Sequence, residues 1–204
     1  MNPFEKGVCR YLGEEELAKI RSVRIGIAGA GGLGSNCAWM LARSGFDDFV
    51  IADHDLVDFS NLNRQFFFAR QVGMPKVEAL RDNLRAINPD VKVAAVQADV
   101  TPENVRALFA DCGAVVEAFD SAACKRMIVE ALLGTDTFLV AASGLAGCGD
   151  ADRIVTRKVK DNFHMVGDLV SEARPDCPPL APCVTIAAAK QADLILEWAI
   201  GRKA

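Results

Sequence analysis

Residues 23–36, VRIGIAGAGGLGSN, decide the fold of this chain. An apolar run of strand length, residues 23–28, breaks into the glycine-rich turn 29–34, and the helix-like stretch 37–43 follows almost at once. A strand, a glycine turn and a helix in this order bring backbone N–H groups and a helix N-terminus against a phosphate. The stretch therefore predicts a phosphate-binding turn at the edge of a sheet. The alternative is a tight strand-to-helix turn that holds no ligand.

Three glycines of this turn have separate physical roles. Gly29 lets the chain turn sharply, Gly31 lets the backbone approach an anion closely, and Gly34 lets the helix pack near the strand. A second apolar strand, 49–52, ends in an acidic segment that begins at Asp53. This segment lies about 20 residues past the glycines, where an acid binds the ribose hydroxyls in dinucleotide-binding folds.

The composition is that of an ordinary globular protein, with 51% hydrophobic residues, 25% charged residues and a formal net charge of -4. A length of 204 residues is enough for one domain with a sizeable core. The negative charge argues against a nucleic-acid partner, and no apolar run approaches the ~20 residues of a membrane span. The N-terminus has no apolar signal core. We therefore expect a cytoplasmic protein that binds neither nucleic acid nor membrane.

The cysteines and histidines do not form a recognisable metal site. The seven cysteines are odd in number and no two are spaced as Cys-x-x-Cys, which argues against a disulfide framework and a four-cysteine zinc site. Cys37 falls in an apolar helical stretch and is expected in the core. His54 and His164 are isolated, and an isolated histidine is more often a surface or hydrogen-bonded residue than a ligand.

Strands and helices alternate along most of the chain. Beyond the two strands already named, the sequence predicts helices at 10–22, 76–87, 101–109 and 122–133, and strands at 91–96, 114–119 and 137–142. The three adjacent phenylalanines at 66–68 indicate that residues 56–73 form a folded loop or a one-turn helix on the body. The alternation predicts an α/β fold: a Rossmann-like, mostly parallel sheet with helices on both faces.

The pattern changes after residue 145. Residues 153–159 are expected to form one more strand, antiparallel to the others, and residues 160–181 show little periodicity. A long apolar helix at 184–200 is expected to end at Gly201. We thus expect one nucleotide-binding domain, 1–204, with three parts: a core (22–145), a short crossover region (146–181) and a C-terminal helix (182–201).

Ligands of an open parallel sheet bind beyond the carboxyl ends of its strands. Four groups of residues follow such ends, namely the glycine turn, Asp53 with Asp55, Asp120, and Ser143 with Gly144. Arg64 and Lys76 lie in the segment after the second strand. These residues predict a nucleotide site with acids at the ribose, cations at the phosphates and Asp120 for a divalent metal.

Each of these residues also has a simpler structural interpretation. Asp53 and Asp55 can form a turn, Arg64 and Lys76 can be solvated surface charges, and Asp120 can cap the helix that begins after it. The prediction of a site depends on all of them reaching one edge of one sheet.

Together these residues resemble the ThiF/MoeB/HesA superfamily, the ATP-dependent activators of ubiquitin-like sulfur carrier proteins. The likeness covers residues 10–145 and the last helix, and its short length is most similar to the compact ThiF-type branch associated with thiamine biosynthesis. The motifs that carry it are GAGGLG (29–34), Asp53-x-Asp55, SNLNRQ (60–65), Gly73-x-x-Lys76 and Asp120.

The resemblance implies a reaction, which is adenylylation of the C-terminal glycine of a carrier that ends in Gly-Gly. It also implies a homodimer. By resemblance, Asp53 binds ribose, Asp120 holds Mg²⁺, and Arg64, Gln65 and Lys76 stabilise charge on ATP, with Arg64, Lys76 and Asp120 as the catalytic set. The other implied nucleotide ligands are Gly29, Gly31, Gly32, Gly34, Asp55 and Asn61.

Three departures from the family pattern bear on these expectations. The zinc-binding cysteine pairs of many relatives are missing, so no zinc is expected. Relatives often carry Arg-Tyr-x-Arg near the N-terminus, but here the second arginine is Gly13, so either Arg10 substitutes or the contact with the partner subunit is lost. Cys177 lies in the crossover region, where some relatives use a cysteine for sulfur transfer; the alternative is a structural loop residue.

Two other functions fit parts of the pattern. An NAD-dependent oxidoreductase would share the glycine turn and Asp53, but it needs neither Arg64 nor Lys76. A non-catalytic module that binds ATP and a carrier would share the whole site without turnover.

Overall fold

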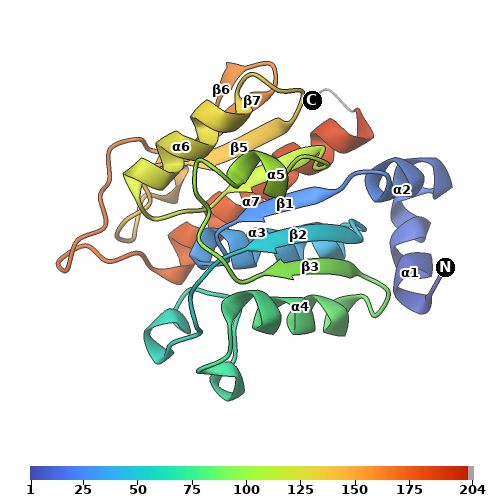
Figure 1. Cartoon of the computed structure of the whole chain (residues 1–204), viewed down its shortest axis with the longest axis horizontal. Helices are drawn as coiled ribbons and strands as arrows, with labels where there is room; N and C mark the ends of the chain where they lie inside the picture. Colours follow the sequence, from blue (N-terminus) through green and yellow to red (C-terminus); the bar gives the residue numbers. More distant parts are fainter. Residues whose placement is uncertain (202–204) are drawn as a thin grey trace.

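A seven-stranded sheet forms the centre of the protein in a computed structural model, which describes residues 1–201 (Figure 1). The strand order is β3-β2-β1-β4-β5-β7-β6, and all neighbours pair in parallel except β6 and β7. The strands are β1 (Ile25–Ala28), β2 (Asp48–Ala52), β3 (Lys92–Val96), β4 (Ala114–Glu117), β5 (Phe138–Ala142), β6 (Val155–Lys160) and β7 (Phe163–Gly167). This confirms the predicted, mostly parallel sheet with an antiparallel extension.

Helices cover both faces of the sheet, as predicted. In Figure 1, α5 and α6 lie on one face, and α3, α4 and α7 lie on the other. The helices are α1 (Pro3–Leu12), α2 (Glu14–Arg21), α3 (Gly32–Arg43), α4 (Lys76–Ile87), α5 (Val105–Leu108), α6 (Ala122–Leu132) and α7 (Ala181–Ile200). Short 3₁₀ turns are η1 (Phe59–Asn61), η2 (Ala69–Gln71) and η3 (Ala151–Arg153). Among the described residues, none of the helices has the length and apolar character that crossing a membrane requires.

The sheet is buried on both faces, so its central strands are apolar throughout. Every residue of β1 and of β4 is buried, which is the pattern of parallel strands with helices on either side. The core divides into two clusters, one on each face of the sheet. One contains Leu41 of α3 and Ile195 of α7, and the other contains Phe109, which follows α5, and Ile128 of α6. Cys37 is fully buried in the first cluster, as predicted, and burial raises the pKa of its thiol.

The N-terminal region differs from the prediction of one helix over 10–22. Two helices occupy it, and they are separated at Gly13, whose φ of 83° lies in the region that favours glycine. The first of them begins with a capping box, in which the Asn2 side chain accepts from the Glu5 backbone N–H and the Glu5 carboxylate accepts from Asn2.

Two further predictions were wrong in part. The expected helix 101–109 is reduced to α5, because Asn104 rather than Thr101 precedes its first residue, and the Asn104 side chain accepts from the Thr101 N–H. The region 160–181 is not wholly irregular, because β7 forms within it and pairs with both β5 and β6. The C-terminal helix α7 begins at Ala181, three residues before the predicted start at 184, and it ends at Ile200 with Gly201 as its C-cap, as predicted. The last three residues of the expected domain, 202–204, lie outside the described residues.

The topology gathers the predicted strand ends at one edge. The neighbours β2, β1, β4 and β5 are parallel, so the glycine turn, Asp53, Asp120 and Ser143 all follow the same edge of the sheet. We call it the carboxyl edge. Helices α1 and α2 lie at the opposite end of the strands (Figure 1).

Candidate nucleotide site

The glycine turn at the end of β1 leaves the start of α3 open. Gly29 has a φ of 97°, and its N–H donates to Ala52 O at 2.9 Å. A Cβ on Gly34 would lie 1.8 Å from Gly29 O, so only glycine permits this close packing of helix on turn. Within residues 1–201, no side chain caps the N-terminus of α3. Its first N–H groups therefore form a surface suited to an anion.

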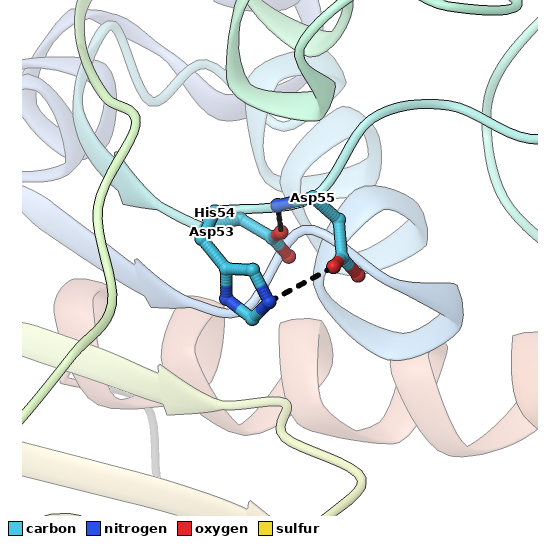
Figure 2. A group of neighbouring side chains, drawn as sticks. All are labelled: Asp53, His54 and Asp55. Atoms are coloured by element: carbon cyan, nitrogen blue, oxygen red, sulfur yellow. Dashed lines mark hydrogen bonds and ion pairs between the residues drawn. The ribbon is translucent and has the colours of Figure 1, made fainter.

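Asp53 is bonded directly to this turn. Its Oδ2 accepts from Ala30 N–H at 2.6 Å, and its Oδ1 accepts from Asp55 N–H at 2.8 Å (Figure 2). Asp53 thus forms a turn with Asp55, as the simpler interpretation expects. The same bonds also place the carboxylate against the glycine turn, where a ribose-binding acid is expected.

Lys76 is not a solvated surface charge. It is 5% exposed, and its Nζ lies 2.5 Å from Asp55 Oδ2. The backbone reinforces the pair, since Lys76 N–H donates to Asp55 O at 2.9 Å. The first turn of α4 is thereby tied to the end of β2, and the ammonium group is held at Asp55, two positions after Asp53 in the sequence.

Arg64 and Gln65 lie against the glycine turn. The Cγ of Arg64 is 3.5 Å from the point where a Cβ on Gly32 would stand, and Gln65 Nε2 is 3.9 Å from the corresponding point on Gly31. The guanidinium of Arg64 donates to Asn63 Oδ1 at 2.8 Å. Gln65 Oε1 is buried and has no hydrogen-bond partner among the described residues. An unpaired buried acceptor beside the turn is the kind of group that a ligand would satisfy.

Two residues that the sequence analysis did not assign hold this segment in place. Ser35 Oγ accepts from Phe66 N–H at 3.0 Å. The Asn36 amide donates both to Gly32 O, at 2.7 Å, and to Arg64 O, at 2.8 Å. Both lie in the first turns of α3, directly after the glycines. Their position beside the glycine turn could have marked them as candidates in the sequence. They fix the backbone of Arg64 relative to the glycine turn.

Three predicted residues are not brought into these contacts. The Asn61 side chain accepts from Asp58 N–H at 3.1 Å in a local capping box. Asp120 is exposed, and the described residues offer it no hydrogen bond or ion pair. The interpretation of Asp120 as a helix cap is wrong, because Ser121 is the N-cap of α6. The Cys177 thiol packs on Gly147, 2.9 Å from the point where a Cβ would lie.

Metal-type ligands gather at the end of β2. Ligand atoms of Asp53, His54 and Asp55 lie within 4.8 Å of one another (Figure 2). However, the two His54 nitrogens already lie 3.0 Å from Asp55 Oδ1 and from Asp99 Oδ1, and Lys76 lies on Asp55 Oδ2. The Asp120 carboxylate, by contrast, has no hydrogen bond or ion pair among the described residues, so its oxygens are available to a divalent cation such as Mg²⁺.

A second ion pair, which sequence reasoning missed, lies at the ends of β4 and β5. Glu117 is fully buried and lies 3.0 Å from Lys125 Nζ. Burial raises the pKa of this carboxyl, and the charge of Lys125 offsets part of that rise.

Two hollows in the surface lie away from the glycine turn. A hollow of about 460 Å³, lined by Arg43, Phe68 and Arg70 among others, and one of about 470 Å³ at α1 contain no residue of the glycine turn. Their size alone identifies no ligand, so the assignment of the site depends on the contacts around the turn.

Comparison with known proteins agrees with this arrangement. The sequence profile described as "ThiF family" matches residues 7–204, nearly the whole chain. The chain belongs to the ThiF family. The resemblance to the ThiF/MoeB superfamily is thereby confirmed.

Two ThiF-type relatives from Bacillus subtilis strain 168 differ in their named substrates. Sulfur carrier protein ThiS adenylyltransferase is 37% identical over 123 residues, 59% of this chain and 37% of that protein. tRNA threonylcarbamoyladenosine dehydratase is 33% identical over 145 residues, 70% of this chain and 57% of that protein. The chain therefore spans about a third to a little over half the length of these relatives.

Solved structures share the fold. The crystal structure of Escherichia coli tRNA N6-threonylcarbamoyladenosine dehydratase in complex with AMP gives a TM-score of 0.87. The match covers 96% of this chain and 93% of that one, at 23% sequence identity. At this identity the likeness establishes the α/β architecture alone.

Proposed function

We propose that this chain binds ATP at the carboxyl edge and adenylylates a carboxylate. The observation that carries the proposal is the position of Arg64 along Gly32, next to the uncapped N-terminus of α3. The stem of Arg64 runs along Gly32, and its guanidinium bonds Ser60 O and Asn63 Oδ1 in the neighbouring segment. A cation near free N–H groups suits a triphosphate better than a redox cofactor, which needs no cation there. The AMP bound in the crystal structure of the Escherichia coli relative supports this choice of nucleotide.

The proposed roles follow the geometry of the site. Asp53 binds the ribose hydroxyls, and Arg64, Gln65 and Lys76 contact the phosphates and neutralise the charge that develops there. Asp120 would hold Mg²⁺, which when bound supplies further charge neutralisation at the phosphates. The remaining proposed nucleotide contacts come from Gly29, Gly31, Gly32, Gly34, Asp55 and Asn61.

The reaction is an in-line displacement at the α-phosphorus. A carboxylate oxygen of the substrate forms the new O–P bond, the bond to the β-phosphate oxygen breaks, and pyrophosphate leaves with that electron pair. No general base is required, because a carboxylate is already ionised near neutral pH. The work of the protein is to hold the phosphates and to stabilise charge, which is the role proposed for Arg64 and Lys76.

The proposed substrate is the C-terminal glycine of a ubiquitin-like sulfur carrier that ends in Gly-Gly. The relative named ThiS adenylyltransferase supports a ThiS-like carrier and a role in thiamine biosynthesis. We place the reaction in the cytoplasm, within a homodimer of single domains whose nucleotide core is 22–145. No zinc takes part in this proposal. Sulfur transfer through Cys177 would be a separate later step, and Cys177→Ser should leave adenylylation intact.

A second candidate substrate is a modified adenosine of tRNA. It is favoured by the dehydratase relatives, which match 70% of this chain in Bacillus subtilis and 72% in Escherichia coli K12. A threonyl group carries a carboxylate, so the same chemistry would apply. The formal net charge of -4 argues against it, because RNA binding needs a basic surface.

The test is ATP–pyrophosphate exchange with Mg²⁺ and purified substrates. We expect exchange that depends on a Gly-Gly carrier, and its loss in Arg64→Ala with the fold retained. Exchange that depends on threonylcarbamoyladenosine-containing tRNA would select the second candidate. Tight binding of NAD instead of ATP in a calorimeter would rule out adenylylation, and ATP binding without exchange on any substrate would indicate a non-catalytic module.

A further inference from the structure

The Glu117 carboxylate joins three parts of the fold at the carboxyl edge. Its Oε1 accepts from Phe119 N–H at 2.8 Å and from Lys125 Nζ at 3.0 Å. Its Oε2 accepts from Lys125 Nζ at 3.1 Å and from Ala142 N–H at 3.5 Å. One buried side chain therefore connects the end of β4, the first turn of α6 and the end of β5.

Lys125 completes the connection. Its ammonium group also donates to Ala142 O at 2.9 Å, so all three of its hydrogens have acceptors. From the other face, the fully buried Gln191 of α7 donates to Glu117 O and to Val140 O, both at 3.2 Å. The ends of β4 and β5 are thus held by charged groups on one side of the sheet and by an amide on the other.

A buried ion pair of this kind is not required for stability. Removing two charges from water costs as much as their attraction returns, and apolar residues of similar volume are often equally stabilising. What the pair does impose is geometry, because both oxygens and all three hydrogens have fixed partners. Residues 118–124, which are the turn from β4 to α6 (118–121) together with the first three residues of α6, are held between its two members. We call this segment the turn 118–124.

That turn adjoins the proposed nucleotide site and carries Asp120. Ala118 N–H donates to Ala28 O at 2.9 Å, and Ala118 O lies 2.9 Å from the point where a Cβ on Gly29 would stand. Asp120 follows two residues later with an unengaged carboxylate. Its position relative to the glycine turn is therefore set by whatever fixes the turn.

We propose that Glu117 and Lys125 are positioning residues, which hold the turn 118–124 so that the Asp120 carboxylate meets the divalent cation of a bound nucleotide. This inference rests on the proposed function. Neither residue touches the nucleotide in this proposal. They act through the backbone of Phe119 and through the first turn of α6.

The first measurement is Mn²⁺ binding by electron paramagnetic resonance, in the presence of a non-hydrolysable ATP analogue. The main variant is Glu117→Gln/Lys125→Met, which removes both charges while keeping similar volumes. We expect Mn²⁺ to bind about tenfold more weakly, by about 1.4 kcal/mol, with metal-free binding of the analogue unchanged. Lys125→Arg, which keeps the charge and the donors, should restore most of the affinity. Lys158→Met, which removes the exposed pair with Asp161, is the matched control and should bind as wild type.

The second measurement is hydrogen exchange in the turn without any ligand. The amides of 118–124 should exchange faster in the double variant, and those of β1 should not. Should the double variant fail to fold, Glu117→Asp, which shortens the side chain and keeps the charge, replaces it in both measurements.

Unchanged Mn²⁺ affinity in a folded variant overturns the positioning role, whether or not the turn exchanges faster. Unchanged exchange together with weaker Mn²⁺ binding also overturns it, because the effect would not pass through the turn. A wild-type chain that binds neither nucleotide nor Mn²⁺ rejects the proposed function itself, and it rejects the inference with it. The two failures are therefore distinguishable.

Discussion

Two ion pairs lie at the same edge of the sheet and are built in opposite ways. In the Lys76–Asp55 pair, the lysine side chain is 6% exposed and the aspartate side chain is 48% exposed. In the Lys125–Glu117 pair the cation is 25% exposed and the acid 1% exposed. The first pair has its open side toward solvent at the glycine turn, whereas the second is closed by the ends of two strands.

The difference shows which pair can exchange partners. Among residues 1–201, Asp55 is the one hydrogen-bond acceptor of the Lys76 ammonium group, so two of its hydrogens remain for an incoming phosphate. The Lys125 ammonium group has no hydrogen to spare. A cation that must bind ligand needs free donors, and one that must fix geometry needs none.

The largest expected effect on stability is that of removing Lys125. Lys125→Met should lower the free energy of unfolding by about 3–5 kcal/mol, because it leaves the Glu117 carboxylate buried without a cation. Urea denaturation at pH 7 measures this loss, and the Glu117→Gln/Lys125→Met variant should recover most of it. A loss below about 1 kcal/mol would mean that the pair is more hydrated than the structure shows.

Lys76 should behave in the reverse manner. Lys76→Met should reduce carrier-dependent pyrophosphate exchange by about 10²–10³-fold, since it removes a charged donor from the transition state. The free energy of unfolding should change by less than about 1 kcal/mol, because Asp55 is half exposed and stays solvated. Lys158→Met is the control and should retain exchange. Full exchange in Lys76→Met would remove Lys76 from the site.

Asn36 tests whether the Arg64 segment depends on its anchor to α3. Asn36→Ala loses the bonds to Gly32 O and Arg64 O, and also the bond that Asn36 Oδ1 accepts from Trp39 Nε1. At ~0.5–1.5 kcal/mol for each hydrogen bond, it should cost about 1.5–4.5 kcal/mol. Amide hydrogen exchange at 63–66 should increase. Asn104→Ala, which also loses two bonds to backbone groups but in a distant turn, should leave the amides of 63–66 unchanged.

The last expected effect is a pH dependence of Lys125→Met. Burial already raises the pKa of Glu117 above its usual 4.5, and loss of the cation raises it further. The unfolded chain then releases the proton at lower pH than the folded chain does. The stability of the variant, compared with Glu117→Gln/Lys125→Met, should therefore fall as pH rises from about 5 to 8, by at most ~1.4 kcal/mol per pH unit. A flat difference over this range would show that Glu117 stays ionised.

Local patterns were enough to predict most of the fold. Apolar runs of strand length, each followed by helical spacing, gave the parallel sheet and its order of helices. The helix α1 was missed although Asn2, Pro3 and Glu5 form a capping signal, and that signal was available. The strand β7 was missed because residues 163–167 are few, do not alternate, and end in a glycine.

Only those parts of the candidate site that follow from short stretches of sequence were predictable. The glycine turn and Asp53 follow from the positions of strand ends, because parallel strands place those ends together. Arg64 and Lys76 lie in the segment after β2, and their roles came from the resemblance to the family. The Glu117–Lys125 pair was not predictable, because its members lie on a strand and a helix eight positions apart and share no periodic face. Partners that meet only through tertiary packing leave no spacing pattern in the sequence.

The outermost strand β6 has a consequence for how copies of this chain coexist. Among residues 1–201 it pairs only with β7, and its exposed stretch contains Arg157, Lys158 and Lys160. Cations along a free sheet border repel the same border of another molecule and discourage strand-by-strand growth into aggregates. The chain can thus keep one long border unpaired at high concentration, and replacing these cations with valine or threonine would remove that protection.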